Sequence, residues 1–504
     1  MSEVILKVEN VSKAFGGVQA LDKVSLTINK GEIHCLAGGN GSGKSTLINI
    51  ISGYHKPDSG TIEINGQQYN RLTPIESIMQ GIQVIYQDLS IFPNLTVAEN
   101  MAINYELYNK VKLINWKSVN NIAKTAMEKL GINLPLNEKV ENLSVADKQL
   151  IAISRAILHN AKLVIMDEPT TALTRKEINK LFSIIKNLQK EGIAILFVSH
   201  KLDEVFEIAE NFTIFRNGYK VVTDFTSNVD SNKFIYYMTG KEIDENNLFD
   251  PKDIDYVKPI FKVENLSKTN GFEGVNFEVY PGEIIGITGL LGSGRTELAK
   301  SLFGIYPAEK GNIYIDGENV RISSPQDALK YKIGYVPEDR LSEGLFLPQS
   351  IVKNLVLSNI DNLLNKNKII DYKKIDEHME YWEEELSIKM SSHDDPIRTL
   401  SGGNQQKIVL AKWLETDPKV LILNGPTVGV DVSTKYDLHN YLREIVKTHN
   451  VAVIIISDDI SEIINNCNRI YVMKKGRISG ELKNKDTNET ELLNIITSQE
   501  VVVS

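Results

Sequence analysis

The chain has 504 residues, and its 56 Lys and Arg against 65 Asp and Glu give a net charge of −9 at pH 7. Hydrophobic residues make up 42% and charged residues 24%, which is typical of a globular protein and excludes a largely disordered chain. The acidic balance argues against nucleic acid as the main partner, because that affinity comes from clustered Lys and Arg. No apolar run approaches the roughly 20 residues of a membrane-spanning helix, so we expect any membrane role to require a partner.

The predicted elements of the first half alternate between strands and helices. Strands are predicted at 33–37, 61–66, 163–166 and 193–198, and helices at 46–52 and 175–190. The later strands are apolar throughout and flank an amphipathic helix, which is typical of a parallel sheet covered by helices. The short β-branched runs near the N-terminus predict a separate antiparallel region. We therefore expect an α/β fold with a mainly parallel core sheet and an antiparallel β annex.

The second half repeats the first in the same order. Val8-Glu-Asn-Val-Ser-Lys13 recurs as Val263-Glu-Asn-Leu-Ser-Lys268, and Gly31-Glu-Ile recurs as Gly282-Glu-Ile at nearly the same spacing. Each copy is far longer than a solenoid repeat, so we predict two homologous domains. The segment between them is charged and aperiodic, as linkers are. The predicted boundaries are domain 1 at 1–240, a linker at 241–258 and domain 2 at 259–504.

A glycine-rich loop between the strand at 33–37 and the next helix fits the pattern G-x-x-x-x-G-K-[ST]. Backbone N–H groups of such a loop surround the phosphates of a nucleotide at a helix N-terminus. We expect Lys44 to contact the β- and γ-phosphates of ATP and the Ser45 hydroxyl to bind Mg²⁺. The loop residues predicted to bind nucleotide are Gly38, Gly39, Asn40, Gly41, Ser42, Gly43, Lys44, Ser45 and Thr46.

Polar residues follow three other predicted strands at the edge of the sheet that carries this loop. Asp167 and Glu168 follow the strand at 163–166, and we expect Asp167 to orient the hydrated Mg²⁺ and Glu168 to act as general base toward water. His200 ends the strand at 193–198, where ligand clefts of α/β proteins form. Gln87 follows another strand-like run and is placed to sense the γ-phosphate or Mg²⁺.

Together these motifs resemble the ATP-binding-cassette (ABC) ATPases over nearly the whole chain. The added mark is the signature loop, Leu400-Ser-Gly-Gly-Asn-Gln405. The resemblance implies two tandem P-loop domains, each with a helical subdomain, which pack head to tail so that the signature of one caps ATP on the P-loop of the other. Phe15 matches the aromatic residue that stacks on adenine. The signature residues that the resemblance assigns to nucleotide binding are Ser401, Gly402, Gly403 and Gln405.

The second copy departs from the pattern at every catalytic position. Arg295 replaces the P-loop lysine, which is not a conservative change. Asn424-Gly425 stands where the first copy has its acidic pair, although family members generally keep acids there. Glu338 and Asp458 occupy the positions of Gln87 and His200, Asn270 that of Phe15, and the first copy's own signature, 143–148, lacks the glycine pair. We therefore expect one competent ATP site, built from the P-loop of domain 1 and the signature of domain 2, and one silent site.

The fused cassettes, the arginine in the second P-loop and the Gly-Asn-Gln signature resemble one branch, the ATPase subunits of bacterial importers for ribose, galactose and xylose. This resemblance implies ATP hydrolysis coupled to import, with a membrane permease dimer and an extracytoplasmic sugar-binding protein as partners. It places the protein at the cytoplasmic face of the bacterial cell membrane, peripheral and without nucleic acid. Ligand choice belongs to the partners, so the particular solute stays open.

Two other classes of protein remain as alternatives. A ribosome-associated translation factor can also carry two cassettes, but such proteins usually have a long helical linker and two intact sites. A non-hydrolysing structural or regulatory cassette protein would fit the second copy alone. The short linker, the net charge of −9 and the complete first site favour the importer subunit over both.

Overall fold

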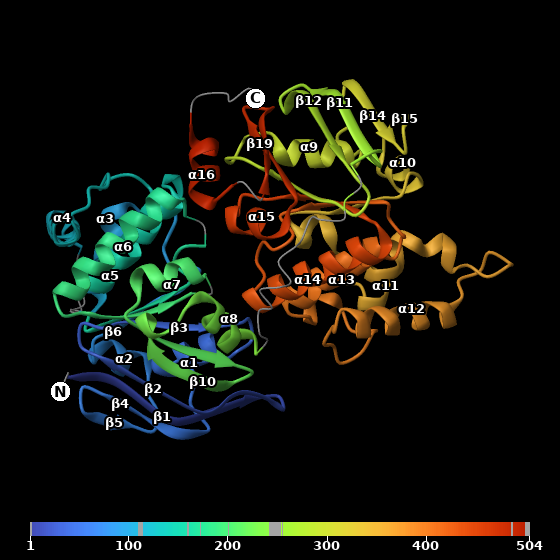
Figure 1. Cartoon of the computed structure of the whole chain (residues 1–504). Helices are drawn as coiled ribbons and strands as arrows, with labels where there is room; N and C mark the ends of the chain where they lie inside the picture. Colours follow the sequence, from blue (N-terminus) through green and yellow to red (C-terminus); the bar gives the residue numbers. More distant parts are fainter. Residues whose placement is uncertain are drawn as a thin grey trace. The chain divides into compact units, whose positions relative to one another are not determined.

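The computed structural model describes residues 3–108, 114–158, 161–171, 173–199, 201–240, 254, 256–484 and 487–498. The chain divides into two compact units, Met1–Ile243 and Asp244–Ser504 (Figure 1). His200 and most of the predicted linker lie outside the described residues. Within the described part of the chain, no helix combines the length and the apolar character needed to cross a membrane.

The first unit contains two sheets. The core sheet has six strands in the order β10-β9-β3-β8-β7-β6, and its strands run parallel except for the pair β9 and β10. The annex has four antiparallel strands in the order β2-β1-β4-β5. The core strands are β3 (Ile33–Gly38), β6 (Ile82–Ile85), β7 (Leu163–Asp167), β8 (Ala194–Val198), β9 (Asn211–Arg216) and β10 (Tyr219–Phe225). The annex strands are β1 (Val4–Phe15), β2 (Val18–Asn29), β4 (Ser59–Ile64) and β5 (Gln67–Tyr69).

Helices surround these sheets, and three of them, α3, α4 and α5, contact one another to form a helical group on the side of the unit away from the annex (Figure 1). The helix α6 has the bounds that its amphipathic pattern predicts. It begins after a capping box in which the Thr174 N–H donates to Glu177 at 2.8 Å. The helices are α1 (Lys44–Ile51), α2 (Pro74–Met79), α3 (Val97–Tyr108), α4 (Trp116–Leu130), α5 (Val145–Leu158), α6 (Arg175–Lys190), α7 (Leu202–Ile208) and α8 (Ser231–Thr239).

The second unit repeats this arrangement. Its core sheet has the order β16-β17-β18-β13-β19-β20 and its annex the order β12-β11-β14-β15, which match the first unit strand for strand. The core strands are β13 (Ile284–Thr288), β16 (Ile333–Val336), β17 (Val420–Asn424), β18 (Ala452–Ile456), β19 (Arg469–Lys474) and β20 (Arg477–Lys483). The annex strands are β11 (Phe261–Lys268), β12 (Phe272–Val279), β14 (Lys310–Ile315) and β15 (Glu318–Val320). The helices are α9 (Arg295–Leu302), α10 (Pro325–Lys330), α11 (Ile351–Val356), α12 (Tyr372–Glu385), α13 (Gly402–Leu414), α14 (Val432–His449), α15 (Ile460–Asn466) and α16 (Glu489–Thr497).

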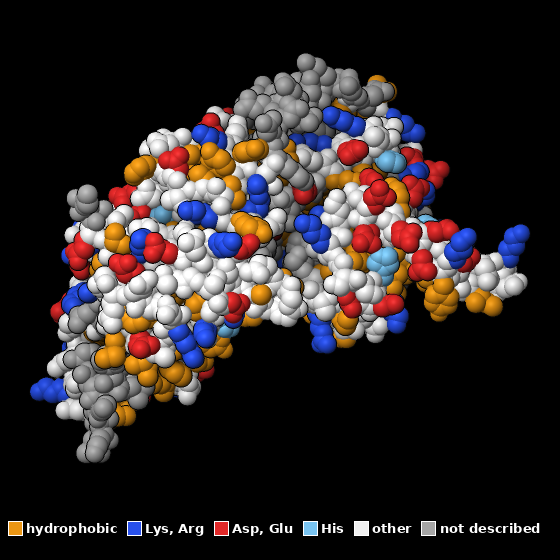
Figure 2. Space-filling model, turned by 90° about the horizontal axis from the view of Figure 1, so that it is seen from below, with side chains coloured by type: hydrophobic (Ala, Val, Ile, Leu, Met, Phe, Trp, Pro, Cys, Tyr) orange, Lys and Arg blue, Asp and Glu red, His pale blue; other side chains and the backbone are white. Residues whose placement is uncertain are grey.

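The fold class that the sequence predicts is therefore confirmed. The central strands β3, β7, β8, β17 and β18 are almost wholly buried, as their continuous apolar runs indicate for parallel strands covered on both faces. On the face seen in Figure 2, acidic and basic side chains are interspersed. One prediction differs slightly: α1 begins at Lys44 rather than Thr46, because Gly43 in the left-handed conformation starts the helix inside the glycine-rich loop.

Candidate functional site

The first P-loop, residues 38–45, joins β3 to α1, and its shape requires glycine at two positions. Gly38 has φ +151° and Gly43 has φ +103°. A Cβ atom on Gly38 would collide with the Phe215 carbonyl oxygen, and one on Gly43 with the Ala20 carbonyl oxygen. The loop thus packs directly against neighbouring backbone, and its own N–H groups are gathered at the N-terminus of α1, a ready position for phosphate.

Lys44 lies over this loop with only 7% of its surface exposed. Its ammonium group donates to the carbonyl oxygens of Gly38 at 2.6 Å and Gly39 at 2.9 Å. The next residue, Ser45, is exposed. A buried ammonium held by the loop and an accessible hydroxyl beside it are the two side-chain groups that a nucleotide phosphate and its magnesium ion require.

The acidic pair lies at the same edge of the sheet, because β7 and β3 both run parallel to β8. Burial raises the pKa of Asp167 above its ordinary value, the charge of Glu168 raises it further, and Lys44 opposes the change. A cation placed beside these carboxylates would stabilise their ionised forms. Among the described residues, no group of three or more His, Cys, Asp or Glu could hold a metal ion. The exposed hydroxyl of Ser45 and the carboxylate of Asp167 suit Mg²⁺ that takes its remaining ligands from nucleotide phosphates and water, as is usual for this ion.

Glu168 has a left-handed backbone conformation, with φ +47°. Its N–H donates to the Val198 carbonyl oxygen at 3.1 Å, which fixes the turn after β7. The corresponding residue of the second unit, Gly425, has φ +58°, and its N–H donates to Ile456 at 2.8 Å. The turn thus demands a positive φ in both units, and the first unit places a glutamate there in spite of the strain. Such strain is characteristic of functional sites.

The remaining residues predicted for the first site lie in separate loops. Phe15 ends β1 with 42% of its surface exposed, and its ring centroid lies 5.1 Å from that of His55. Gln87 is exposed just after β6. His200 lies outside the described residues, but the preceding Ser199 is buried and its hydroxyl donates to Glu204 at 2.7 Å.

The signature loop of the second unit leads into α13. Ser401 is the N-cap of this helix, and its hydroxyl accepts from the Asn404 N–H at 3.4 Å. The N–H groups of Gly402 and Gly403 lie in the first turn, where an anion is favoured. Gln405 is buried, and its amide donates to the carbonyl oxygens of Ile397 and Leu400 at 3.4 and 3.2 Å. The Gln405 side chain therefore supports the loop from inside the unit.

Sequence reasoning missed Arg340, which borders the signature loop. Its guanidinium donates to the Val428 carbonyl oxygen at 2.8 Å and to that of Gly429 at 3.3 Å. A Cβ on Gly402 would lie 2.7 Å from the same guanidinium. The only signal in the sequence is an arginine two residues after Glu338, and nothing in that spacing indicates the contact.

The first unit's own signature segment is built differently. The Ser144 hydroxyl caps α5 by accepting from the Asp147 N–H at 3.1 Å and donating to its carboxylate at 2.8 Å. Val145, with 45% of its surface exposed, occupies the first turn where the second unit has glycine. A branched side chain at this position covers backbone N–H groups that glycine would leave accessible.

The second P-loop, residues 289–296, keeps the backbone conformation of the first, but an arginine replaces its lysine. Arg295 is 6% exposed and donates to the Gly289 carbonyl oxygen at 2.7 Å, as Lys44 does to Gly38. Its other terminal nitrogen forms an ion pair with Asp458 at 3.2 Å. The Thr296 hydroxyl donates to Glu338 at 3.3 Å. Acidic side chains are thus bonded to both Arg295 and Thr296, the two side chains that would contact the phosphate and the metal ion.

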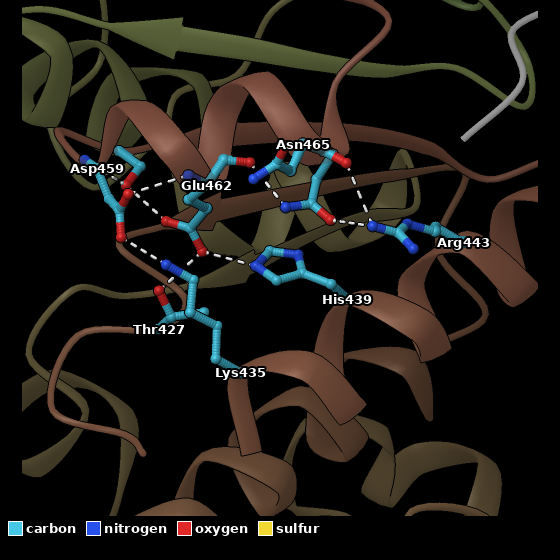
Figure 3. A network of polar contacts seen from close by, with 9 residues as sticks. Thr427, Lys435, His439, Arg443, Asp459, Glu462 and Asn465 are labelled. Carbon is cyan, nitrogen blue, oxygen red and sulfur yellow. Dashed lines mark hydrogen bonds and ion pairs between the residues drawn. The ribbon is translucent and has the colours of Figure 1, made fainter. Parts of the chain in front are cut away.

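The loop that carries Asp458 is flanked by a polar network centred on the buried Glu462 (Figure 3). Glu462 accepts from Ser457 at 2.6 Å, from Thr427 at 2.8 Å and from the His439 ring at 2.9 Å. Asp459 caps α15 and forms an ion pair with Lys435. These contacts join the segment after β17 to the segment after β18. In the first unit the aligned position of His439 is Phe182, which packs against Phe197.

Comparison with known proteins gives a consistent result. The family model described as ABC transporter matches residues 21–171 and 272–428. The chain is 39% identical over 496 residues to a putative ribose/galactose/methyl galactoside import ATP-binding protein of Halalkalibacterium halodurans, covering 98% of this chain and 94% of that protein. It is 41% identical over 493 residues to a ribose import ATP-binding protein of Clostridium perfringens, covering 97% and 98%. A solved ATP-binding cassette of an ABC transporter in its ADP conformation is 30% identical, with a TM-score of 0.42, and covers 46% of this chain and 98% of its own.

Proposed function

Because the chain belongs to the ABC transporter family, we propose that it is the ATP-hydrolysing subunit of an importer for ribose or a related monosaccharide. The observation that carries this proposal is the similarity over nearly the full length of both chains to import ATP-binding proteins of that class. The complete set of catalytic groups in the first unit supports hydrolysis. No comparison supports the translation-factor alternative.

The chemistry proposed for the first site follows from the positions of its side chains. The P-loop amides and Lys44 bind the β- and γ-phosphates of ATP, and Phe15 stacks on the adenine. Ser45, Asp167 and Gln87 hold Mg²⁺, which neutralises charge on the phosphates when bound. Glu168, held at the sheet edge by its strained turn, orients the attacking water and accepts its proton.

We further propose that the signature loop of the second unit completes this site. The support is the one-sided pattern of the changes: the unit with the eroded P-loop keeps the glycine pair at 402–403, and the unit with the intact P-loop has lost it. His200, by the resemblance, contacts the γ-phosphate, and Gln405 acts by holding the loop that carries Ser401.

An import ATP-binding protein works with a membrane permease, and an importer of this class also uses an extracytoplasmic binding protein. We propose both as partners here, with the chain peripheral at the cytoplasmic face of the membrane through the permease. Pull-down from solubilised membranes should recover a polytopic protein. Recovery of ribosomes instead would contradict the importer assignment.

The decisive experiment compares matched hydroxyls in the two P-loops of the full-length chain. Ser45→Ala is expected to lower ATP turnover by about 100-fold, because it removes a metal ligand of the working site, whereas Thr296→Ala should retain most of the turnover. Equal losses in the two variants would show that hydrolysis is shared between the sites. Reconstitution with the permease, and stimulation of turnover by ribose against galactose, would then identify the solute.

A further inference from the structure

The second P-loop keeps a complete backbone cradle for phosphate. A Cβ on Gly289 would collide with the Met473 carbonyl oxygen, and one on Gly294 with that of Gly271, just as Gly38 and Gly43 face carbonyl oxygens in the first unit. Gly294 has φ +96° and precedes α9. The amide groups that surround a phosphate are thus retained, although the catalytic acids are gone.

The position that a γ-phosphate would take is different. In the first unit the Lys44 ammonium group donates to the carbonyl oxygens of Gly38 and Gly39. In the second unit the buried Arg295 holds a carboxylate, Asp458, at 3.2 Å. A γ-phosphate must displace this carboxylate or lie beside it, and like charges at such a distance repel. A β-phosphate held by the backbone amides avoids that conflict.

The metal position is also less favourable for a triphosphate. The Thr296 hydroxyl is bonded to Glu338, and the residue aligned with Asp167 is Asn424. Asn424 is buried, with 2% of its surface exposed. A neutral amide in place of a carboxylate gives weaker support to a hydrated Mg²⁺ bridging β- and γ-phosphates.

We propose that the second P-loop is a non-hydrolytic nucleotide site that prefers a nucleoside diphosphate to a triphosphate, with the Asp458 carboxylate occupying the place of the γ-phosphate on Arg295. The backbone on either side of Asp458 is fixed, because Ser457 before it donates to Glu462 and Asp459 after it caps α15. The Asp458 side chain is 67% exposed, so the ion pair is screened by solvent and sets a moderate preference rather than an absolute one.

Fluorescent ADP and ATP analogues can test this preference in full-length Lys44→Ala protein, where only the second P-loop retains its cation. ADP is expected to bind about 10-fold more tightly than ATP, and Asp458→Asn should raise ATP affinity by about 10-fold while changing ADP affinity less than about 3-fold. Asp459→Asn is the matched control, because it removes the same charge one residue away and keeps an N-cap. Arg295→Ala should abolish the signal.

Equal affinity for the two nucleotides, no binding of either, or an equal gain from Asp458→Asn and Asp459→Asn would each overturn the proposal. If Lys44→Ala does not fold, equilibrium dialysis with Glu168→Gln protein can be used instead. We then expect two bound ADP but only one tightly bound ATP per chain. Adding Arg295→Ala to this protein should remove one of the two ADP. Two tightly bound ATP per chain would overturn the proposal. The proposal rests on the proposed function only in taking nucleotide as the ligand, and binding at this site can fail while turnover at the first site persists.

Discussion

Replacing Glu168 by glycine should make the protein more stable and nearly inactive. Glu168 has φ +47°, a conformation that costs an L-residue roughly 1–2 kcal/mol, whereas glycine adopts it freely. The greater freedom of glycine in the unfolded chain offsets about 0.5–1 kcal/mol of this gain. Removing the charge beside Asp167, which raises the pKa of that buried carboxyl, adds to the gain. The net expectation is about 1 kcal/mol of added unfolding free energy.

Calorimetry of the full-length chain measures this change. For a unit of this size, about 1 kcal/mol raises the unfolding midpoint by about 2–4 °C. ATP turnover should fall by about 100- to 10,000-fold, the usual loss of a general base. The control is Glu191→Gly, at an exposed helix end with φ −78°, which should lower the midpoint because no strain is relieved. A midpoint lowered in both variants would refute the strain argument, and retained turnover in Glu168→Gly would refute the role of the carboxylate.

Three further results are expected. Phe15→Ala should weaken ATP binding by about 10-fold, and Phe15→Tyr should not, as measured by nucleotide titration, because the loss is one of ring stacking. Gly403→Ala should lower the unfolding free energy by about 1–3 kcal/mol in urea denaturation, because its Cβ would lie 2.5 Å from the Thr434 hydroxyl. Adding Thr434→Ala should restore part of this loss. If it restores none, a clash with Thr434 is not the cause. Burial alone would raise the pKa of Glu462, but the hydrogen bond and charge of His439 and the other partners lower it from 4.5 to about 2. The contribution of Glu462 to stability is therefore present above pH 4.5 and is lost as the pH falls from 4.5 toward 2. Glu462→Gln should flatten that part of the curve of unfolding free energy against pH.

Local patterns sufficed to predict most of the core. The helix at Arg175–Lys190 has its predicted bounds because a capping box and a regular apolar stripe both specify them. The strands at 163–167 and 194–198 differ from their predicted bounds by one residue, since continuous apolar runs are bounded by polar turns. The start of α1 was missed, because a glycine in the left-handed conformation is set by packing against Ala20 rather than by helix propensity.

The finer features of the sites depend on contacts between distant parts of the chain. The ion pair of Arg295 with Asp458, the bonds of Arg340 to Val428 and Gly429, and the network around Glu462 each join residues whose proximity follows only from strand order. The strain at Glu168 was equally hidden, because glutamate gives no sign of a positive φ. Only the alignment with Gly425 could have indicated it, since glycine marks the conformation that the turn requires.

The two units have the same strand order and lie in one chain, so a mutation can change one unit and leave the other unchanged. A single cassette that pairs with its own copy would carry every substitution twice, so losing its acidic pair would silence both catalytic centres at once. When the two copies are encoded in one gene, a substitution such as that at Asn424 affects one half only, and both halves are always made in equal number. The duplicated fold thereby allows one half to drift toward a new ligand while selection preserves turnover in the other.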